Sequence, residues 1–114
     1  SQMRIIDSTL TRDELTRLAE KTFGDFVKSV VDVELRIVAI DAELHSDLEA
    51  SLLEKGSKQK DLWGINLYPK LQGDESIEFD SMINMRPSQG NLSRGVDSKE
   101  LREKIVKIVS EKIL

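Results

Sequence analysis

The strongest constraint on the fold is a change in the hydrophobic period along the chain. Between residues 31 and 39 every odd position is apolar, while the even positions include charged residues. Such alternation is typical of a strand that buries one face. Residues 63–67 and residues 77–85 repeat the pattern on either side of a turn, and residues 3–6 add a brief apolar stretch. The pattern therefore predicts three strands and a short fourth strand at the edge.

Three other segments carry the signals of helix starts. In each one, a capping residue is followed three positions later by a glutamate: Thr11 and Glu14, Ser46 and Glu49, Asp97 and Glu100. This spacing is that of a capping box, in which the two side chains bond unpaired N–H groups at the helix start. Gly24 and Gly56 follow the first two segments, as is common after helix C-termini. The sequence thus predicts three helices, and in the first of them Phe23 belongs to the inward stripe.

The order of these elements predicts the fold class. An edge strand is followed by a helix, a strand, a helix, two strands and a helix, the order (β)αβαββα. This order favours an α+β two-layer sandwich, with a small mixed or antiparallel sheet of three or four strands and three helices on one face. The step through the second helix is expected to be a right-handed crossover, and the last two strands a hairpin. Residues 1–114 contain no linker and fit a single α+β domain.

Composition and charge narrow the functions that the chain can have. Acids and bases are interspersed and the net charge is -4, so neither nucleic acid nor a membrane is expected as a partner. The absence of cysteine excludes disulfides, thiolate metal sites and thiol nucleophiles, and fits a cytoplasmic protein. No apolar run is long enough to span a bilayer. His45 is the only histidine, which argues against a histidine-based zinc site and favours a structural role.

The even-numbered positions of the predicted strands form a polar face. If the helices cover the odd-numbered face, this second face is a solvent surface, a self-association surface or a working site. Four of its acids carry the oxygen ligands that Mg²⁺ and Mn²⁺ prefer: Asp32, Glu34, Glu78 and Asp80. One alternative is therefore a divalent-metal-dependent hydrolase that uses these acids. Another is a homodimer joined through the polar face or through an exposed strand edge.

The loop RPSQGNLSRGV, residues 86–96, is basic and contains no acid, although the chain as a whole is acidic. Arg86 and Arg94 supply forked donors, and its glycines allow backbone amides to turn inward around an anion. The predicted ligand-binding residues are Arg86, Ser88, Gln89, Asn91 and Arg94. The other interpretation is an ordered turn whose side chains bond their own backbone. We interpret the chain as a small cytoplasmic binding module for a phosphate-bearing or carboxylate ligand.

Three segments of the chain resemble a known family. They are GDFVKSVVDVE, ELHSDLEASLLEKGSKQKDLWGINLYP and IEFDSMINMRPSQGNLSRGV. Together they resemble a small bacterial and archaeal family of single-domain proteins that is classed as a domain of unknown function, and the resemblance covers nearly the whole chain after Leu10. It implies one compact domain. Because the family has no assigned activity, the resemblance assigns no catalytic or binding residue, and whether the protein is an enzyme stays open.

Overall fold

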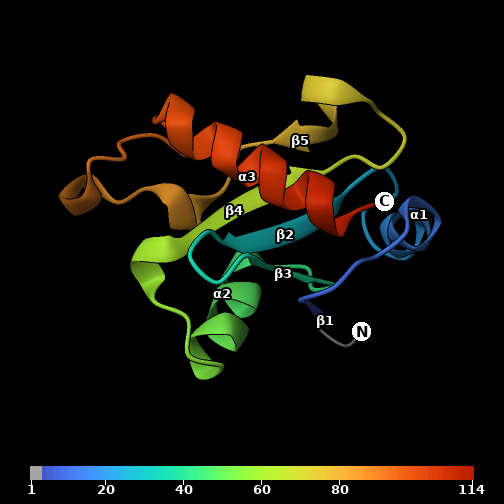
Figure 1. The fold of residues 1–114 in the computed structure, drawn as a ribbon, viewed down its shortest axis with the longest axis horizontal. Coiled ribbons are helices and arrows are strands. Elements are labelled where there is room, and N and C mark those ends of the chain that lie inside the picture. The colour runs from blue at the N-terminus through green and yellow to red at the C-terminus, as the bar shows by residue number, and fades with distance from the viewer. Residues whose placement is uncertain (1–3) are drawn as a thin grey trace.

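The computed structural model describes residues 4–114, which form a five-stranded sheet with helices on both of its faces (Figure 1). The strands are β1 (Arg4–Ile6), β2 (Val27–Asp32), β3 (Ile37–Ile40), β4 (Leu62–Leu67) and β5 (Ile77–Glu78). They pair antiparallel in the order β1-β3-β2-β4-β5. The helices are α1 (Arg12–Lys21), α2 (His45–Glu54) and α3 (Lys99–Lys112). The α+β class is confirmed, and so is the edge strand, although its predicted first residue, Met3, lies outside the described residues.

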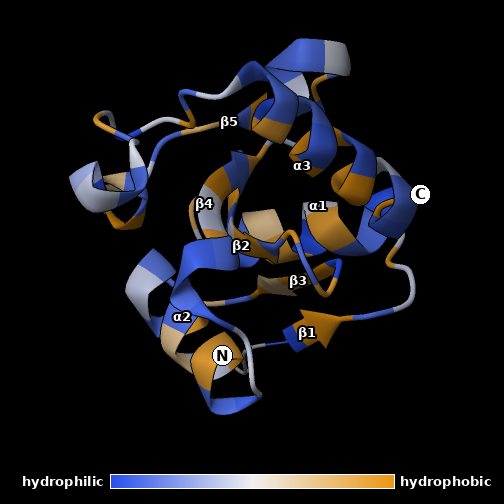
Figure 2. Cartoon of the chain, turned by 60° about the vertical axis from the view of Figure 1, so that its left-hand side comes forward, coloured by the Kyte–Doolittle hydropathy of each residue, from blue (hydrophilic) through white to orange (hydrophobic). Residues whose placement is uncertain are grey.

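The helices form two outer layers instead of one (Figure 2). On one face, α2 packs Leu48 and Leu52 against Val30, Ala39 and Leu62. On the other face, side chains of α1 and α3 join a larger core. The predicted two-layer sandwich, with every helix on one face, is therefore wrong. The reason is that β2 and β4 carry buried apolar side chains on both faces, so each face needs a helix to cover it.

The predicted strand over residues 31–39 is a hairpin of β2 and β3. Asp32 closes its turn, because its Oδ1 accepts the backbone N–H groups of Glu34 and Leu35, both at 2.9 Å. Beyond the turn the parity changes, so the even positions of β2 and the odd positions of β3 lie on the same face. The apolar residues of the turn continue the odd-numbered alternation, which is why the pattern concealed it. The sheet therefore has more strands than predicted.

The last predicted strand, residues 77–85, is mostly not a strand. β4 and β5 form the predicted hairpin, but β5 ends at Glu78, and the chain continues through short 3-10 helices, among them η3 (Met82–Asn84). Asn84 supplies the reason. Its side-chain amide accepts the N–H of Gly64 at 2.8 Å and donates to the carbonyl of Gly64 at 3.0 Å. One amide thus takes the place that a continued strand would have beside β4.

The predicted helix starts are confirmed for α1 and shifted for α3. The Thr11 hydroxyl accepts the N–H of Glu14, and the Glu14 carboxylate accepts the N–H of Thr11, so the capping box is present. In α3 the cap is Ser98, whose hydroxyl accepts the N–H of Leu101 at 3.2 Å. Asp97, the predicted cap, bonds the preceding loop instead. Within residues 4–114 no helix is both long and apolar enough to cross a membrane.

Candidate functional site

A row of polar side chains crosses three neighbouring strands on the face that α2 partly covers. Lys28 of β2 stands opposite Asn66 of β4, and Asn66 stands opposite Glu78 of β5. We call these three residues the polar row. Lys28 is half-buried, Asn66 is buried and Glu78 is exposed, so the row opens toward the β5 edge of the sheet.

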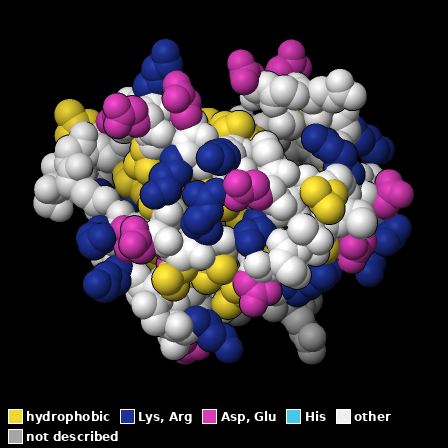
Figure 3. Space-filling model, in the orientation of Figure 1, with side chains coloured by type: hydrophobic (Ala, Val, Ile, Leu, Met, Phe, Trp, Pro, Cys, Tyr) yellow, Lys and Arg dark blue, Asp and Glu magenta, His cyan; other side chains and the backbone are white. Residues whose placement is uncertain are grey.

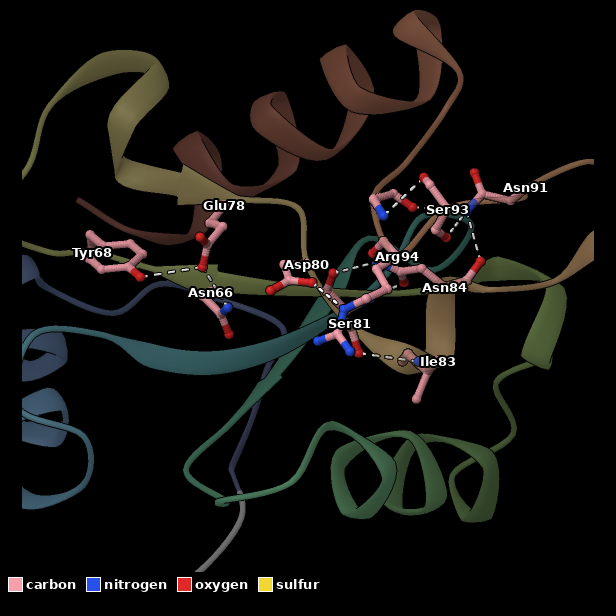
Figure 4. Close-up of polar contacts among 12 residues, drawn as sticks. Asn66, Tyr68, Glu78, Asp80, Ser81, Ile83, Asn84, Asn91, Ser93 and Arg94 are labelled. Atoms are coloured by element: carbon pink, nitrogen blue, oxygen red, sulfur yellow. Dashed lines mark hydrogen bonds and ion pairs between the residues drawn. The ribbon is translucent and has the colours of Figure 1, made fainter.

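Asn66 is bonded to Glu78 through its side chain and leaves one acceptor without a donor. Its Nδ2 donates to Oε1 of Glu78 at 2.8 Å, and the hydroxyl of Tyr68 donates to the same oxygen at 3.3 Å (Figure 4). Because the amide nitrogen must face the carboxylate, the orientation of the Asn66 amide is fixed. Its Oδ1 then has no hydrogen-bond partner among the described residues, although the side chain is only 6% exposed. An unmet buried acceptor of this kind costs about 1–3 kcal/mol.

An ion pair lies beside the polar row. Nε of Arg94 is 2.6 Å from Oδ1 of Asp80, and Figure 4 shows Arg94 reaching Asp80 from the loop that precedes α3. The two side chains are 52% and 44% exposed, so solvent screens the pair and it adds less than about 1 kcal/mol to stability. Exposed donors of Arg94 are therefore available at the surface.

His45 starts α2 and closes the other side of the site. The predicted cap at Ser46 is wrong, because α2 begins one residue earlier and its N-cap, Leu44, supplies no side-chain acceptor. The His45 ring is buried, and its Nε2 lies 2.8 Å from the carbonyl oxygen of Ile65, so Nε2 carries the proton and donates. This hydrogen bond ties the start of α2 to β4, and the structural role of His45 stays a prediction.

The pKa of His45 is affected by burial and by charged side chains nearby. Burial lowers the pKa of His45, the hydrogen bond to Ile65 opposes this effect, and the nearby charges of Lys28 and Arg94 lower the pKa further. Asp80 acts in the opposite direction. We therefore group His45, Asp80 and Arg94 with the polar row and call the set the polar site.

An aromatic cluster borders the polar site. Phe23 and Phe26 stack with their centroids 4.7 Å apart, and Phe26 contacts the ring of Tyr68 at 5.4 Å. Lys28 Nζ lies 5.5 Å from the centroid of Phe23. Phe23 is 40% exposed, so its predicted place in the inward stripe of the first helix is wrong. The helix ends at Lys21 before its stripe reaches Phe23, and the repeated phenylalanine in Phe-Gly-Asp-Phe was the sequence signal that could have revealed the cluster.

The cluster also affects Tyr68, which joins it to the polar row. Burial raises the pKa of Tyr68, and the neighbouring Glu78 carboxylate raises it further. The hydroxyl therefore stays protonated and keeps donating to Glu78. The aromatic edge and the polar row are thus connected by one hydrogen bond.

Two of the predicted ligand-binding residues fasten the loop to the start of β4. Arg86 stacks on the ring of Trp63 at 4.1 Å and donates to the carbonyls of Leu62, at 2.7 Å, and of Gln59. Gln89 donates to the carbonyl of Lys60 at 2.7 Å. Burial lowers the pKa of Arg86, which remains charged. The bonds that these side chains donate all go to the protein's own backbone, while the buried Nε of Arg86 has no partner among the described residues.

A third predicted residue, Asn91, ties the loop to itself. It is buried, and its Nδ2 donates to the carbonyls of Asn84 at 2.7 Å and Gly95 at 2.8 Å, while its Oδ1 accepts the N–H of Asp97 at 2.8 Å. Ser88 is exposed in η4 (Pro87–Gln89). Of the five predicted residues, Arg94 is the one that the structure brings to the polar site.

The acids of the metal alternative lie in two separate places. Asp32 stands opposite Leu62 at one end of β4 and accepts the hydroxyl of Ser57 at 2.6 Å, while Glu34 lies in the β2–β3 turn. Glu78 stands opposite Asn66 near the other end of β4, with Asp80 two residues further on. In the described part of the chain, no three histidine or acidic side chains are placed to hold one metal ion. The hydrolase and the homodimer stay predictions.

The fold and the polar site define a small α+β protein whose antiparallel sheet leaves part of one face polar and accessible. The chain belongs to the family described as protein of unknown function DUF5674, whose model matches residues 4–112. The resemblance seen in the sequence is thereby confirmed, and one family domain spans nearly all of the described residues. No curated protein matches the chain, and no solved structure matches it either.

Proposed function

We propose that the chain is a binding module for a small phosphate-bearing or carboxylate ligand, held at the polar site by Lys28 and Arg94. The observation that carries this proposal is the state of Lys28. Its side chain rises half-buried from the central strand of the sheet, and it forms no ion pair within residues 4–114. A lysine whose residue is half-buried and whose ammonium has no carboxylate partner can anchor an anionic group.

The two cations of the polar site support an anionic ligand on their side, away from the acids Glu78 and Asp80. The charges of Lys28 and Arg94 both lower the pKa of His45, so an anion bound beside His45 would be attracted by both cations. The start of α2 adds the positive end of a helix dipole with no side-chain cap, offset in part by Asp47 in the first turn. Asp80 engages only Nε of Arg94, which leaves the terminal nitrogens of that guanidinium for two parallel bonds to an anion.

The predicted loop enters the proposal as the support of Arg94. Arg86, Gln89 and Asn91 hold the loop against β4 and against its own backbone. A donor mounted on a fastened loop loses little conformational entropy when it binds. Arg86, Gln89 and Asn91 are therefore not proposed to contact the ligand. They hold in position the loop that carries Arg94, which is proposed to contact it.

An NMR titration tests the proposal. Inorganic phosphate, acetate, a sugar phosphate and a nucleotide are added separately while the backbone amides and the His45 ring are followed. Saturable shifts are expected at Lys28, His45 and Arg94, and the bound anion should raise the pKa of His45 because it stabilises the imidazolium. No saturable shift at these residues with any of the four anions would refute the proposal.

Two variants and a matched control make the test specific. Lys28→Gln and Arg94→Gln each remove one charged donor, so the affinity should fall about tenfold in each. Lys104→Gln removes a lysine of α3, outside the polar site, and should leave the affinity unchanged. Equal losses in all three variants would show that the anion responds to net charge and not to this site.

A further inference from the structure

A groove runs along α3, on the opposite side of the sheet from the polar site. Two adjoining cavities form it, with volumes of ≈ 190 and ≈ 580 Å³, and Gly73, Asp74, Ile77 and Val106 line both of them. One wall is α3, and the other is η2 (Gly73–Ser76) with β5. Because the cavities share their lining, they are parts of one continuous depression.

The middle of the groove is apolar. Ile77, Phe79 and Val106 line the larger cavity, and Val106 is 38% exposed although it belongs to a helix that covers the core. Leu15 and Val109 continue the apolar lining into the smaller cavity. Figure 3 shows hydrophobic side chains exposed among lysine and arginine side chains on the face that α3 crosses. A concave apolar wall with a few polar groups at its rim is the usual form of a small-molecule site.

The charge of the groove changes along the helix. Lys99 and Arg102 line the larger cavity at the N-terminal end of α3, and neither forms an ion pair in the part of the chain described here. Arg102 is held in place, because its Nη1 donates to the carbonyls of Val96 at 2.6 Å and Asp97 at 3.2 Å. Glu103 and Asp74 also line this cavity, so an anionic group fits only on the side of the two cations. The positive end of the α3 dipole adds to their attraction.

We propose that this groove binds an amphipathic carboxylate, with its carboxylate at Lys99 and Arg102 and its apolar chain along Ile77 and Val106. The distance from Arg102 to Val109 along the helix is about 10 Å, which matches a medium-length acyl chain. The carboxylate position at Lys99 and Arg102 is separate from the polar site, although Tyr68, which donates to Glu78, lines the smaller cavity. The proposal does not depend on the function of the polar site. A polar anion such as phosphate lacks the chain that the apolar wall requires.

A titration with octanoate tests the proposal on the whole chain. Methyl signals of Ile77 and Val106 and the amides of Lys99 and Arg102 should shift with saturation, while the amides of Lys28, His45 and Arg94 stay in place. Acetate has the head without the chain and should shift neither set of groove signals. Octylammonium and octanol have the chain with a cationic or a neutral head and should bind more weakly than octanoate, octylammonium most weakly. Equal binding of the three chains, or none by octanoate, would overturn the assignment.

Surface variants complete the test without disturbing the core. Val106→Glu places a charge on the apolar wall and should weaken octanoate about tenfold, while Lys99→Glu should weaken it roughly threefold to fivefold. Lys107→Glu changes a lysine of the same helix outside the groove lining and should have no effect. If Lys107→Glu weakens octanoate as much as Lys99→Glu does, the carboxylate is not held where we propose.

Discussion

The two faces of the sheet differ in how completely they are covered. On the face of α1 and α3, one continuous core takes side chains from β1 to β4. On the other face, α2 covers a smaller core around Val30 and Leu62 and leaves the polar row beside it only partly covered, with Glu78 exposed. The comparison shows that a polar strand position predicts an open surface only where no helix lies over it. The uncovered part of the α2 face is therefore where the polar site forms.

The largest effects should come from truncating the two cores. Ile105→Ala on α3 and Leu52→Ala on α2 each remove a fully buried side chain, so each should lower the free energy of unfolding by about 2–5 kcal/mol. Urea unfolding followed by circular dichroism measures both. If Leu52→Ala costs less than about 1 kcal/mol, α2 is not a true second layer and the comparison between the faces fails.

A smaller loss of stability is expected from a substitution at Gly64, where the segment around Ser81 packs closely against β4. A Cβ added at Gly64 would lie 2.6 Å from both Cβ and Oγ of Ser81, so Gly64→Ala should lower the free energy of unfolding by about 1–3 kcal/mol. The double variant with Ser81→Gly should recover part of this loss, because the clash is then removed. Additive losses in the double variant would show that Ser81 is not the cause.

Much of the architecture was predictable because its signals are local. The capping box of Thr11 and the burial of Trp63, Ile65 and Leu67 depend on residues close in sequence, and both are confirmed. The β2–β3 turn was missed, since Leu35 continues the apolar alternation although it lies outside the strands. Asn84 was expected in a strand, because nothing local shows that its amide replaces a strand beside β4.

The polar site was only partly predictable, because it depends on contacts between distant segments. Asn66, Glu78 and Asp80 were placed on a polar face by their alternation, and the structure brings them together there. Lys28 was missed because the predicted strand began at residue 31, whereas β2 begins at Val27. Arg86 was expected to face a ligand, and only the folded chain shows that the Trp63 ring lies beneath it.

The pH dependence of stability tests how tightly the polar site is closed at His45. Burial lowers the pKa of His45 from 6.5, so the unfolded chain binds its proton more readily than the folded one. Above pH 6.5 the imidazole is neutral in both states and does not affect the free energy of unfolding. As the pH falls from 6.5 toward the lowered pKa of the folded state, the unfolded chain takes up the proton first and the free energy of unfolding declines. Urea unfolding at a series of pH values measures the decline.

A matched variant assigns this decline to one residue. His45→Gln keeps a side-chain N–H donor for the carbonyl of Ile65 and removes the titration, so the decline just below pH 6.5 should disappear. If the decline persists in the variant, acidic groups elsewhere cause it, and His45 is less enclosed than the hydrogen bond and burial indicate.

The smallest change in stability should come from a substitution at Asp80. This substitution distinguishes the effect of the ion pair on stability from its effect on ligand affinity. Asp80→Asn removes the charge of an exposed ion pair, so the free energy of unfolding should change by less than about 1 kcal/mol. The affinity for phosphate should nevertheless rise severalfold, because a carboxylate that competes with the anion for Arg94 is gone. Calorimetric titration with phosphate measures the affinity. A fall in affinity would mean that Asp80 holds Arg94 in its binding position, so that the ion pair belongs to the site as a support and not as a competitor.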